Sequence, residues 1–338
     1  MKNFLLGCDW GTSAFRLGLY NLGEQRLMGE IETDDGISGI HRHWKNDLHN
    51  PGGPSLRQVF RDSLHQQIQK LSRQLSIPLD NIPVLISGMA SSSIGLEDLP
   101  YANLPFPLDG SGAVTRVFRS DKEFPHEIML ISGVKGTNDV MRGEETQLVG
   151  IAEMMQAHKS AAFEGVIICP GTHSKHLYVK AGKIIHFKTF MTGELFDILG
   201  HHSILREAIS WPSGDDLQPS AMMAFRTGVH AAGKNNLLQT LFSVRTNRLF
   251  DLMNHEENGY YLSGLLIGTE MADLSATPEE HCFLCSGKKL HDLYRIALEE
   301  MGLGDRSHFI PTAWVETAAL NGQRIIYDHF LKQEPANG

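Results

Sequence analysis

The hydrophobic pattern near the start of the chain predicts a β-hairpin with a third strand beside it. Phe4–Cys8 is an apolar run typical of a buried strand, and Phe15–Tyr20 alternates apolar and other side chains as a half-buried strand does. The loop between them, Asp9–Ser13, is a Gly-Thr turn rich in hydroxyls. Arg26–Thr33 is predicted as the third strand of this unit.

The same pattern returns at mid-chain. Val166–Cys169 is a second apolar run, and His176–Val179 is a second alternating strand. The loop Pro170–Lys175 again contains Gly-Thr, and Ile184–Phe190 is the third strand. Two such hairpins in one chain indicate two related halves that face a shared ligand.

Helical spacing of apolar residues and short apolar runs predict an α/β chain around these hairpins. Gly264 and Gly268, four residues apart in one expected helix, permit close packing against a neighbouring element. The expected strands are 83–86, 127–131 and 282–285, and the expected helices are 54–75, 147–155, one that opens at 191–196, 222–241, 260–274, one that follows residue 288, and 314–331.

Composition and charge narrow the class of protein. A chain of 338 residues favours two domains, and we expect boundaries at 1–155, 156–312 and 313–331, the last a terminal helix that packs back on the first domain. A hydrophobic content of 41% with 20% charged residues is typical of a soluble globular protein, and a net charge of −9 argues against nucleic acid as the main partner. Without an apolar run of membrane-spanning length or a signal peptide, we expect a cytoplasmic protein whose four cysteines are reduced core residues.

The Gly-Thr loops have the chemistry to hold phosphate. Neither a Gly-x-x-x-x-Gly-Lys-Ser/Thr loop nor a Gly-x-Gly-x-x-Gly loop is present, but successive backbone N–H groups of a Gly-Thr hairpin also form a concave donor site. Asp9 ends the first strand beside the expected phosphates, so a Mg²⁺ ion between them is the sensible interpretation. The alternative for Asp9 is a residue that caps its own turn.

Three further segments carry candidate chemistry. The segment 133–146 concentrates more charge than a simple connection needs. The small residues 87–93 follow a buried strand and either let a ligand approach the backbone or form an ordinary turn. Ser286, Gly287 and Lys288 join a strand to a helix, an arrangement that suits the adenine or ribose end of a nucleotide.

Five segments carry a resemblance to a known family. The chain resembles the sugar kinases of the actin-like ATPase superfamily, and among them it is similar to the 2-dehydro-3-deoxygalactonokinase family. The segments keep their order and spacing over most of the chain, and they are Asp9–Ser13, Asp139–Gln147, Pro170–Lys175, Phe190–Leu195 and Leu262–Gly268.

This resemblance implies two duplicated actin-like (ribonuclease H-like) α/β domains with mixed sheets around an interdomain cleft, with sugar bound mainly by the first domain and ATP by the second. It implies transfer of the γ-phosphate of Mg-ATP to the C6 hydroxyl of 2-dehydro-3-deoxy-D-galactonate, a step in galactonate catabolism. Many superfamily sugar kinases carry an Asp before the second Gly-Thr loop. Pro170 stands there in this chain, so metal binding is expected to depend more heavily on Asp9.

Phosphoryl transfer depends on positioning and charge neutralisation, so charge assigns the expected roles. Asp9 is expected to hold Mg²⁺ through water, and Asp139 to act as the base for the C6 hydroxyl, because it lies in an Asn-Asp pair like that of many superfamily sugar kinases. Arg142 suits the substrate carboxylate or the developing phosphoryl charge. The expected donors to the β- and γ-phosphates are Gly11, Thr12, Ser13, Gly171, Thr172 and Ser174.

Several candidates keep two interpretations. Lys175 is either a phosphate contact or a solvated lysine, and Ser91 and Ser92 are sugar-site candidates. Glu144 and Glu145 either bind sugar hydroxyls or cap the helix that begins there. Thr192 and Glu194 likewise either bind sugar or start a helix.

The alternatives to this function are a kinase for another sugar acid such as 2-dehydro-3-deoxygluconate, a non-catalytic nucleotide-binding sugar sensor, and a nucleotide or polyphosphate hydrolase on the same fold. The charged loop 139–145 favours a kinase over the last two. For the oligomeric state, we consider a homodimer.

Overall fold

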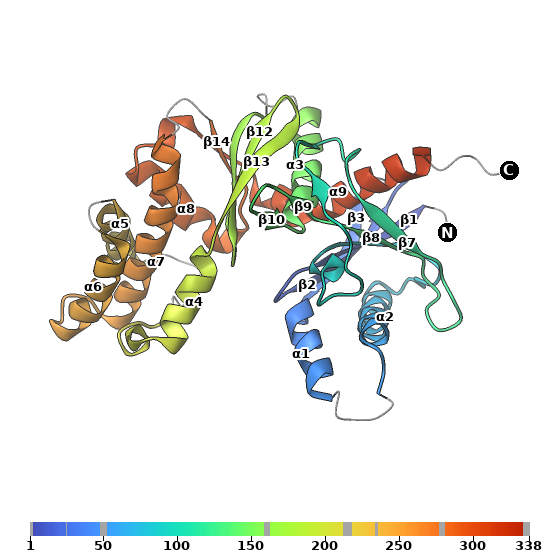
Figure 1. Cartoon of the computed structure of the whole chain (residues 1–338), viewed down its shortest axis with the longest axis horizontal. Helices are drawn as coiled ribbons and strands as arrows, with labels where there is room; N and C mark the ends of the chain where they lie inside the picture. Colours follow the sequence, from blue (N-terminus) through green and yellow to red (C-terminus); the bar gives the residue numbers. More distant parts are fainter. Residues whose placement is uncertain are drawn as a thin grey trace. The chain divides into compact units, whose positions relative to one another are not determined.

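The structure is a computed structural model that describes residues 3–24, 26–47, 53–158, 163–211, 218–233, 236–276 and 281–333. The chain divides into two compact units (Figure 1). The first unit contains residues 1–163, 181–186 and 313–338, and the second contains residues 164–180 and 187–312.

A six-stranded mixed sheet forms the centre of the first unit. The predicted hairpin is present, with Leu6 opposite Leu19, and the fourth and eighth strands continue the sheet in parallel on the other side of the first. In pairing order, the strands are β3 (Arg26–Thr33), β2 (Phe15–Asn21), β1 (Phe4–Trp10), β4 (Val84–Gly88), β8 (Ile128–Ile131) and β7 (Thr115–Phe118).

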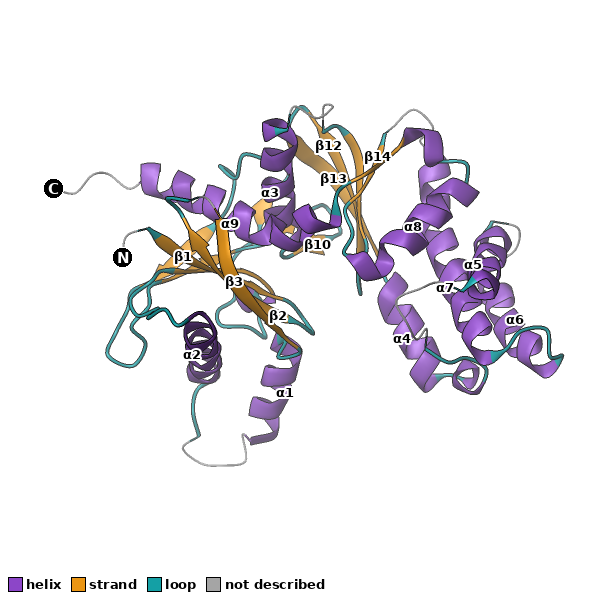
Figure 2. Ribbon diagram, turned by 180° about the vertical axis from the view of Figure 1, so that it is seen from behind, coloured by secondary structure: helices purple, strands orange, loops and turns teal. Residues whose placement is uncertain are grey.

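Helices cover both faces of this sheet (Figure 2). On one face lie α1 (Ile37–Asp47) and α2 (Leu56–Leu75), whose buried residues Phe60, Leu64 and Leu71 follow helical spacing and pack with the strands. Ser55 caps α2 by accepting the N–H of Gln58.

On the opposite face lie α3 (Glu144–Ala157) and α9 (Thr312–Gln333), and glycines allow them to approach closely. A Cβ added at Gly7 of β1 would stand 2.0 Å from Leu320 Cδ1 of α9. A Cβ at Gly322 of α9 would stand 1.8 Å from the carbonyl oxygen of Thr146 in α3. The terminal helix therefore packs directly against the sheet and against α3.

A second, three-stranded sheet carries much of the charged segment. Its strands are β5 (Ala102–Asn103), β9 (Val134–Lys135) and β10 (Val140–Met141), and a short 3₁₀ helix, η1 (Met89–Ser91), follows β4.

The second unit is built on another six-stranded mixed sheet. Residues 181–186 belong to the first unit, where Lys183 pairs with Pro107 and Ile184 pairs with Phe106. In pairing order, the strands are β15 (Ser307–Phe309), β14 (Cys282–Leu284), β11 (Gly165–Cys169), β12 (Ser174–Lys180), β13 (Lys183–Phe190) and β6 (Phe106–Pro107).

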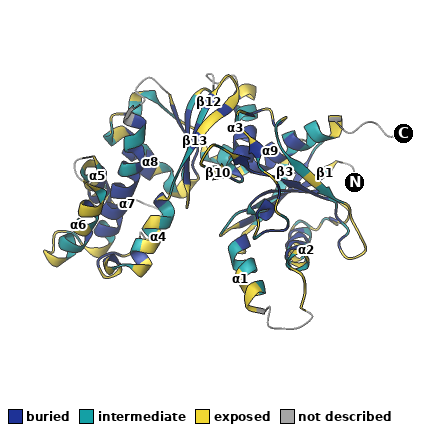
Figure 3. Ribbon diagram, viewed as in Figure 1, coloured by how far each residue is buried: buried dark blue, intermediate teal, exposed yellow. Residues whose placement is uncertain are grey.

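Helices pack against this sheet around a second core (Figure 3). The expected close approach at Gly264 is present, since a Cβ there would stand 2.1 Å from the carbonyl oxygen of Phe225. The elements are α4 (Thr192–His202), η2 (Ile204–Glu207), α5 (Pro219–Ala232), α6 (Leu237–Leu249), α7 (His255–Met271), η3 (Ala272–Ala276), α8 (Lys288–Glu300) and η4 (Gly304–Arg306).

Several expected helix bounds were wrong, and the helix expected at 260–274 spans His255–Met271. The helical pattern at 222–241 belongs to two helices, α5 and α6, and residues 234–235 between them lie outside the described part of the chain. The helix expected at 147–155 begins at Glu144, so two glutamates occupy its first turn.

The duplication is visible in the sheets. Both halves place their first strand between an antiparallel hairpin partner and a parallel strand, in the orders β3-β2-β1-β4-β8 and β13-β12-β11-β14-β15. This topology confirms the predicted actin-like α/β fold with duplicated mixed sheets. All four cysteines are free and buried, and none of the described helices combines the length and apolarity needed to cross a membrane.

Candidate active site

The carboxylate of Asp9 stands at the end of β1 between two glycines of positive φ. Gly88 (φ 88°) ends β4, and Gly143 (φ 115°) precedes α3. A Cβ added at Gly88 would stand 3.2 Å from Asp9 Oδ1, and one at Gly143 would stand 3.7 Å from the same oxygen. From α3, Gln147 Nε2 donates to Asp9 Oδ2 at 3.5 Å. Two glycine residues, which have no side chain, therefore lie beside Oδ1 of this carboxylate.

The surroundings of Asp9 disfavour the ionised form of its carboxylate. Burial, with a smaller contribution from the charge of Glu144, raises the pKa of Asp9 to about 6, although Arg16 and the Gln147 hydrogen bond act to lower it. Such a carboxylate gains from a nearby cation.

These residues fit a hydrated Mg²⁺ ion. Mg²⁺ commonly keeps several waters and binds proteins through one or two carboxylates together with substrate phosphates. Asp9 supplies one such carboxylate, and burial and the charge of Glu144 disfavour its ionised form unless a cation is near. Within the described ranges no group of three or more His, Cys, Asp or Glu side chains forms a complete metal cage.

The first Gly-Thr loop is supported from behind by the start of α1. The N–H groups of Ile37 and Ser38 donate to the carbonyl oxygens of Gly11 (3.0 Å) and Thr12 (3.1 Å). A Cβ at Gly36 would stand 2.3 Å from the carbonyl oxygen of Thr12. Thr12 is half-buried and Ser13 is exposed.

Asp139 lies in the turn between β9 and β10. Its backbone carbonyl accepts the N–H of Gly136 at 2.8 Å, and its Oδ1 accepts the N–H of Val140 at 2.8 Å. The residue is half-buried.

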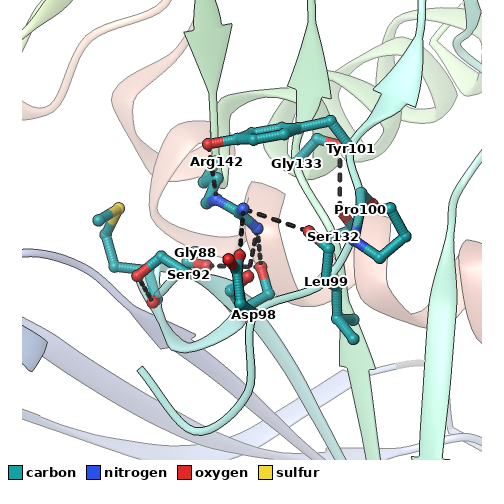
Figure 4. A network of polar contacts seen from close by, with 11 residues as sticks. Gly88, Ser92, Asp98, Leu99, Pro100, Tyr101, Ser132, Gly133 and Arg142 are labelled. Atoms are coloured by element: carbon teal, nitrogen blue, oxygen red, sulfur yellow. Dashed lines mark hydrogen bonds and ion pairs between the residues drawn. The ribbon is translucent and has the colours of Figure 1, made fainter. Parts of the chain in front are cut away.

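Arg142 is the centre of a polar network that shapes the segment after β4 (Figure 4). Its side chain is 4% exposed, and its guanidinium lies 4.0 Å from the centre of the Tyr101 ring. Its five N–H groups have five acceptors: the carbonyl oxygen and hydroxyl of Ser91, the hydroxyl of Tyr101, the carboxylate of Asp98 and the carbonyl oxygen of Leu99.

The two serines of this segment also have structural partners. The hydroxyl of Ser91 donates to the carbonyl oxygen of Gly88 at 3.2 Å, and that of Ser92 donates to the carbonyl oxygen of Met89 at 2.7 Å. Both residues are buried.

Both glutamates at the start of α3 accept backbone N–H groups, as the capping interpretation predicts. Glu144 Oε2 accepts from Arg142 at 3.1 Å, and the Glu145 carboxylate accepts from Gly143 at 2.9 Å and from the hydroxyl of Thr146 at 2.9 Å. Burial, with a smaller contribution from the charge of Glu144, raises the pKa of Glu145 to about 7.

The second Gly-Thr loop is open on one side and tightly supported on the other. A Cβ added at Gly171 would meet nothing within 4 Å. Behind the loop, a Cβ at Gly193 would stand 2.5 Å from the carbonyl oxygen of Gly171, and the N–H of Glu194 donates to the carbonyl oxygen of Thr172 at 3.0 Å. The structure therefore brings Glu194, a sugar-site candidate, against the expected phosphate loop.

Lys175 is 4% exposed, which excludes a solvated lysine, and its Nζ donates to the carbonyl oxygen of His173 at 3.4 Å.

At the far end of β14, Gly287 caps α8, and Gly287 and Lys288 are exposed while Ser286 is buried. A Cβ at Gly287 would meet nothing within 4 Å, so backbone is accessible at this strand-to-helix turn.

Sequence reasoning missed Gln147 and Glu270. Gln147 stood inside a recognised segment, one helical turn after Gly143, and that spacing could have pointed it toward Asp9. Glu270 lies at the end of an apolar helical run, and a single glutamate there does not by itself indicate a buried, functional carboxylate.

The duplicated sheets, each with a Gly-Thr loop, have the actin-like fold, and the match to a kinase family makes this chain a phosphotransferase with an alcohol acceptor. The sequence matches the 2-keto-3-deoxy-galactonokinase family over residues 9–322, and the chain belongs to that family.

Named relatives agree with this assignment. The chain is 32% identical over 310 residues to the probable 2-dehydro-3-deoxygalactonokinase of Rhizobium meliloti, covering 88% of this chain and 90% of the relative. It is 32% identical over 308 residues to the 2-dehydro-3-deoxygalactonokinase of Escherichia coli, with the same coverage of 88% and 90%. The crystal structure of a putative 2-dehydro-3-deoxygalactonokinase from Sinorhizobium meliloti matches with a TM-score of 0.74 at 26% identity, covering 99% of this chain and 98% of that one.

Proposed function

We propose that this chain transfers the γ-phosphate of ATP to the C6 hydroxyl of 2-dehydro-3-deoxy-D-galactonate. The observation that carries the proposal is the carboxylate of Asp9 between the bare backbones of Gly88 and Gly143, at the end of a strand that leads into a Gly-Thr loop. Membership of the 2-keto-3-deoxy-galactonokinase family and the names of both relatives support the substrate.

In the first unit, Asp9 would hold Mg²⁺ through water, and Gln147 keeps its carboxylate in place. A Mg²⁺ ion held there would supply charge neutralisation for the transferred phosphoryl group. The backbone N–H groups and hydroxyls of Thr12 and Ser13 would donate to phosphate oxygens. The N–H of Gly11, expected as a further donor, instead donates to the carbonyl oxygen of Ala14 at 2.9 Å and closes the turn.

Asp139 is the proposed base for the C6 hydroxyl. It is half-buried, and its Oδ1 accepts the N–H of Val140 at 2.8 Å, which holds the side chain in the turn between β9 and β10. A carboxylate held there would take the proton of the hydroxyl during phosphoryl transfer.

Arg142 would bind the substrate carboxylate in place of Asp98. Its Nη2 atom holds the weakest partners, Asp98 and the Leu99 carbonyl, both at 3.3 Å. The side chain of Asp98 is 63% exposed, so a sugar-acid carboxylate can replace it on the guanidinium without breaking the contacts to Ser91 and Tyr101. Ser91, Ser92, Glu144 and Glu145 then act by shaping the sugar site.

In the second unit, the open side of Gly171 and Thr172 would bind the nucleotide phosphates, with Lys175 beneath the loop. The turn Ser286–Lys288 would lie near adenine or ribose, because its accessible backbone and the N-terminus of α8 offer donors at one point.

A coupled ADP-release assay over a panel of 2-dehydro-3-deoxy sugar acids tests this function, with ³¹P NMR to locate the phosphate on the product. We expect turnover that depends on both ATP and the galactonate-derived acid, with a 6-phosphate product. ATP consumption without sugar would indicate a hydrolase, and sugar or nucleotide binding without turnover would indicate a sensor. Preference for the gluconate-derived acid would overturn the substrate assignment.

A further inference from the structure

Glu270 is a buried carboxylate with four polar partners. It lies near the end of α7 and is 2% exposed. The hydroxyl of Ser174 donates to Oε1 at 2.6 Å, where His176 Nε2 also lies at 3.0 Å. The hydroxyls of Thr192 and Tyr294 donate to Oε2 at 2.5 and 2.8 Å. A carboxylate this deeply buried is stable only with such hydrogen bonds, so the cluster is a connected polar unit.

The partners join elements that are distant in the sequence. Ser174 and His176 begin β12, directly after the second Gly-Thr loop. Thr192 is the first residue of α4, and Tyr294 belongs to α8. Glu270 therefore links the end of the loop to the start of α4.

The start of α4 in turn sets the position of the loop. Gly193 packs on the carbonyl of Gly171, and the N–H of Glu194 donates to the carbonyl oxygen of Thr172. The carboxylate of Glu194 also lies 2.5 Å from His173 Nε2. A shift of α4 would move all three loop residues.

The first unit repeats this construction with other residues. Gln67 of α2 is 3% exposed, and its Nε2 donates to Asp35 Oδ2 at 2.9 Å. Asp35 directly precedes Gly36, which packs on the carbonyl of Thr12. In each unit, a buried side chain on the helix before the fourth strand, Gln67 of α2 or Glu270 of α7, is hydrogen-bonded to the residue that precedes a glycine packed on the Gly-Thr loop. The same kind of support is therefore built twice from different side chains.

We propose that Glu270 is a positioning residue for the nucleotide, a role that rests on the proposed binding of ATP phosphates by the second loop. Glu270 fixes Ser174 and Thr192 so that the backbone of Gly171–His173 keeps the conformation that receives phosphate. The hydroxyl protons of Ser174 and Thr192 point to Glu270, so both residues act from beneath the loop, and Thr192 serves the nucleotide rather than the sugar.

The substitution Glu270→Gln tests this role, because it removes one acceptor and turns an amide N–H₂ toward a donor. We expect the Kd of a non-hydrolysable ATP analogue and the KM for ATP to rise about tenfold or more, with the KM for the sugar acid unchanged. Thr192→Val removes a single donor, and we expect a smaller rise in the same two quantities.

Asn258→Ala is the matched control on the same helix. Asn258 is fully buried, and its Nδ2 donates to the carbonyl oxygens of Ala208 and Val244, away from the loop. We expect this variant to lower the Tm while leaving the ATP analogue Kd unchanged.

Unchanged binding of the ATP analogue by Glu270→Gln would overturn the inference. So would a Glu270→Gln variant that changes both KM values equally and lowers the Tm as Asn258→Ala does. A Thr192→Val variant that affects only the KM for the sugar acid would also overturn it. If Glu270→Gln fails to fold, Thr192→Val and Ser174→Ala give the same readouts. A wild-type chain that does not bind the analogue would instead overturn the proposed function, and this inference with it.

Discussion

The backbone N–H of Glu194 donates to the carbonyl oxygen of Thr172 at 3.0 Å, which joins the first turn of α4 to the second Gly-Thr loop. Its counterpart in the other unit is the N–H of Ser38, which donates to the carbonyl oxygen of Thr12 at 3.1 Å. Each loop is therefore held by a helix N-terminus that follows the third strand. The duplicated unit consists of the hairpin together with this helix.

Gly193→Ala tests whether the support governs nucleotide binding. The added Cβ would stand 2.5 Å from the Gly171 carbonyl oxygen and 2.8 Å from Thr172 Cα, so the loop or α4 must shift. A displacement of this kind is expected to lower kcat/KM for ATP about 10- to 100-fold, measured by steady-state kinetics at saturating sugar acid.

Gly233→Ala is the control for that variant, because a Cβ there meets nothing within 4 Å. It should leave both KM values unchanged. A Gly193→Ala enzyme with the kinetics of Gly233→Ala would show that the contact between α4 and the loop does not matter for turnover.

The hairpins could be predicted because the strand pattern and the Gly-Thr turn are local in sequence. The break between α5 and α6 was missed, since a helical pattern continues on both sides of it. The role of Glu270 could not be predicted, because its partners come from β12, α4 and α8 and meet only in the folded unit. Gly88 stood in the small-residue segment 87–93, but the position of Gly88 and Gly143 beside Asp9 could not be predicted, because it depends on how β1, β4 and α3 pack.

Asp9→Asn should abolish Mg²⁺-dependent turnover. The amide keeps the shape of the side chain but loses the charge that would hold the ion, and we expect kcat/KM to fall about 10³-fold or more. Turnover measured across a Mg²⁺ titration checks this. A variant whose Mg²⁺ dependence matches the wild type would remove Asp9 from the metal site.

Asp139→Asn should lower kcat by about 10²- to 10⁴-fold, because an amide cannot accept the proton of the C6 hydroxyl. Asparagine can still accept the N–H of Val140 through its Oδ1, so the turn between β9 and β10 should persist. The measurement is single-turnover phosphoryl transfer, with the Kd of an ATP analogue as the control. A kcat within a few-fold of the wild type in the folded variant would show that another group is the base.

Glu145→Gln should change how stability depends on pH. Burial raises the pKa of Glu145 from 4.5 to about 7, so between these values the folded state binds the proton more tightly than the unfolded state does. Its contribution is fully present below about pH 4.5 and is lost as the pH rises through 7. Because glutamine carries no charge, the variant should be more stable than the wild type at pH 8, by at most about 3 kcal/mol, and the advantage should vanish at low pH. Urea unfolding of both proteins from pH 4.5 to 8 measures the difference, and a pH-independent difference would contradict a buried, ionisable Glu145.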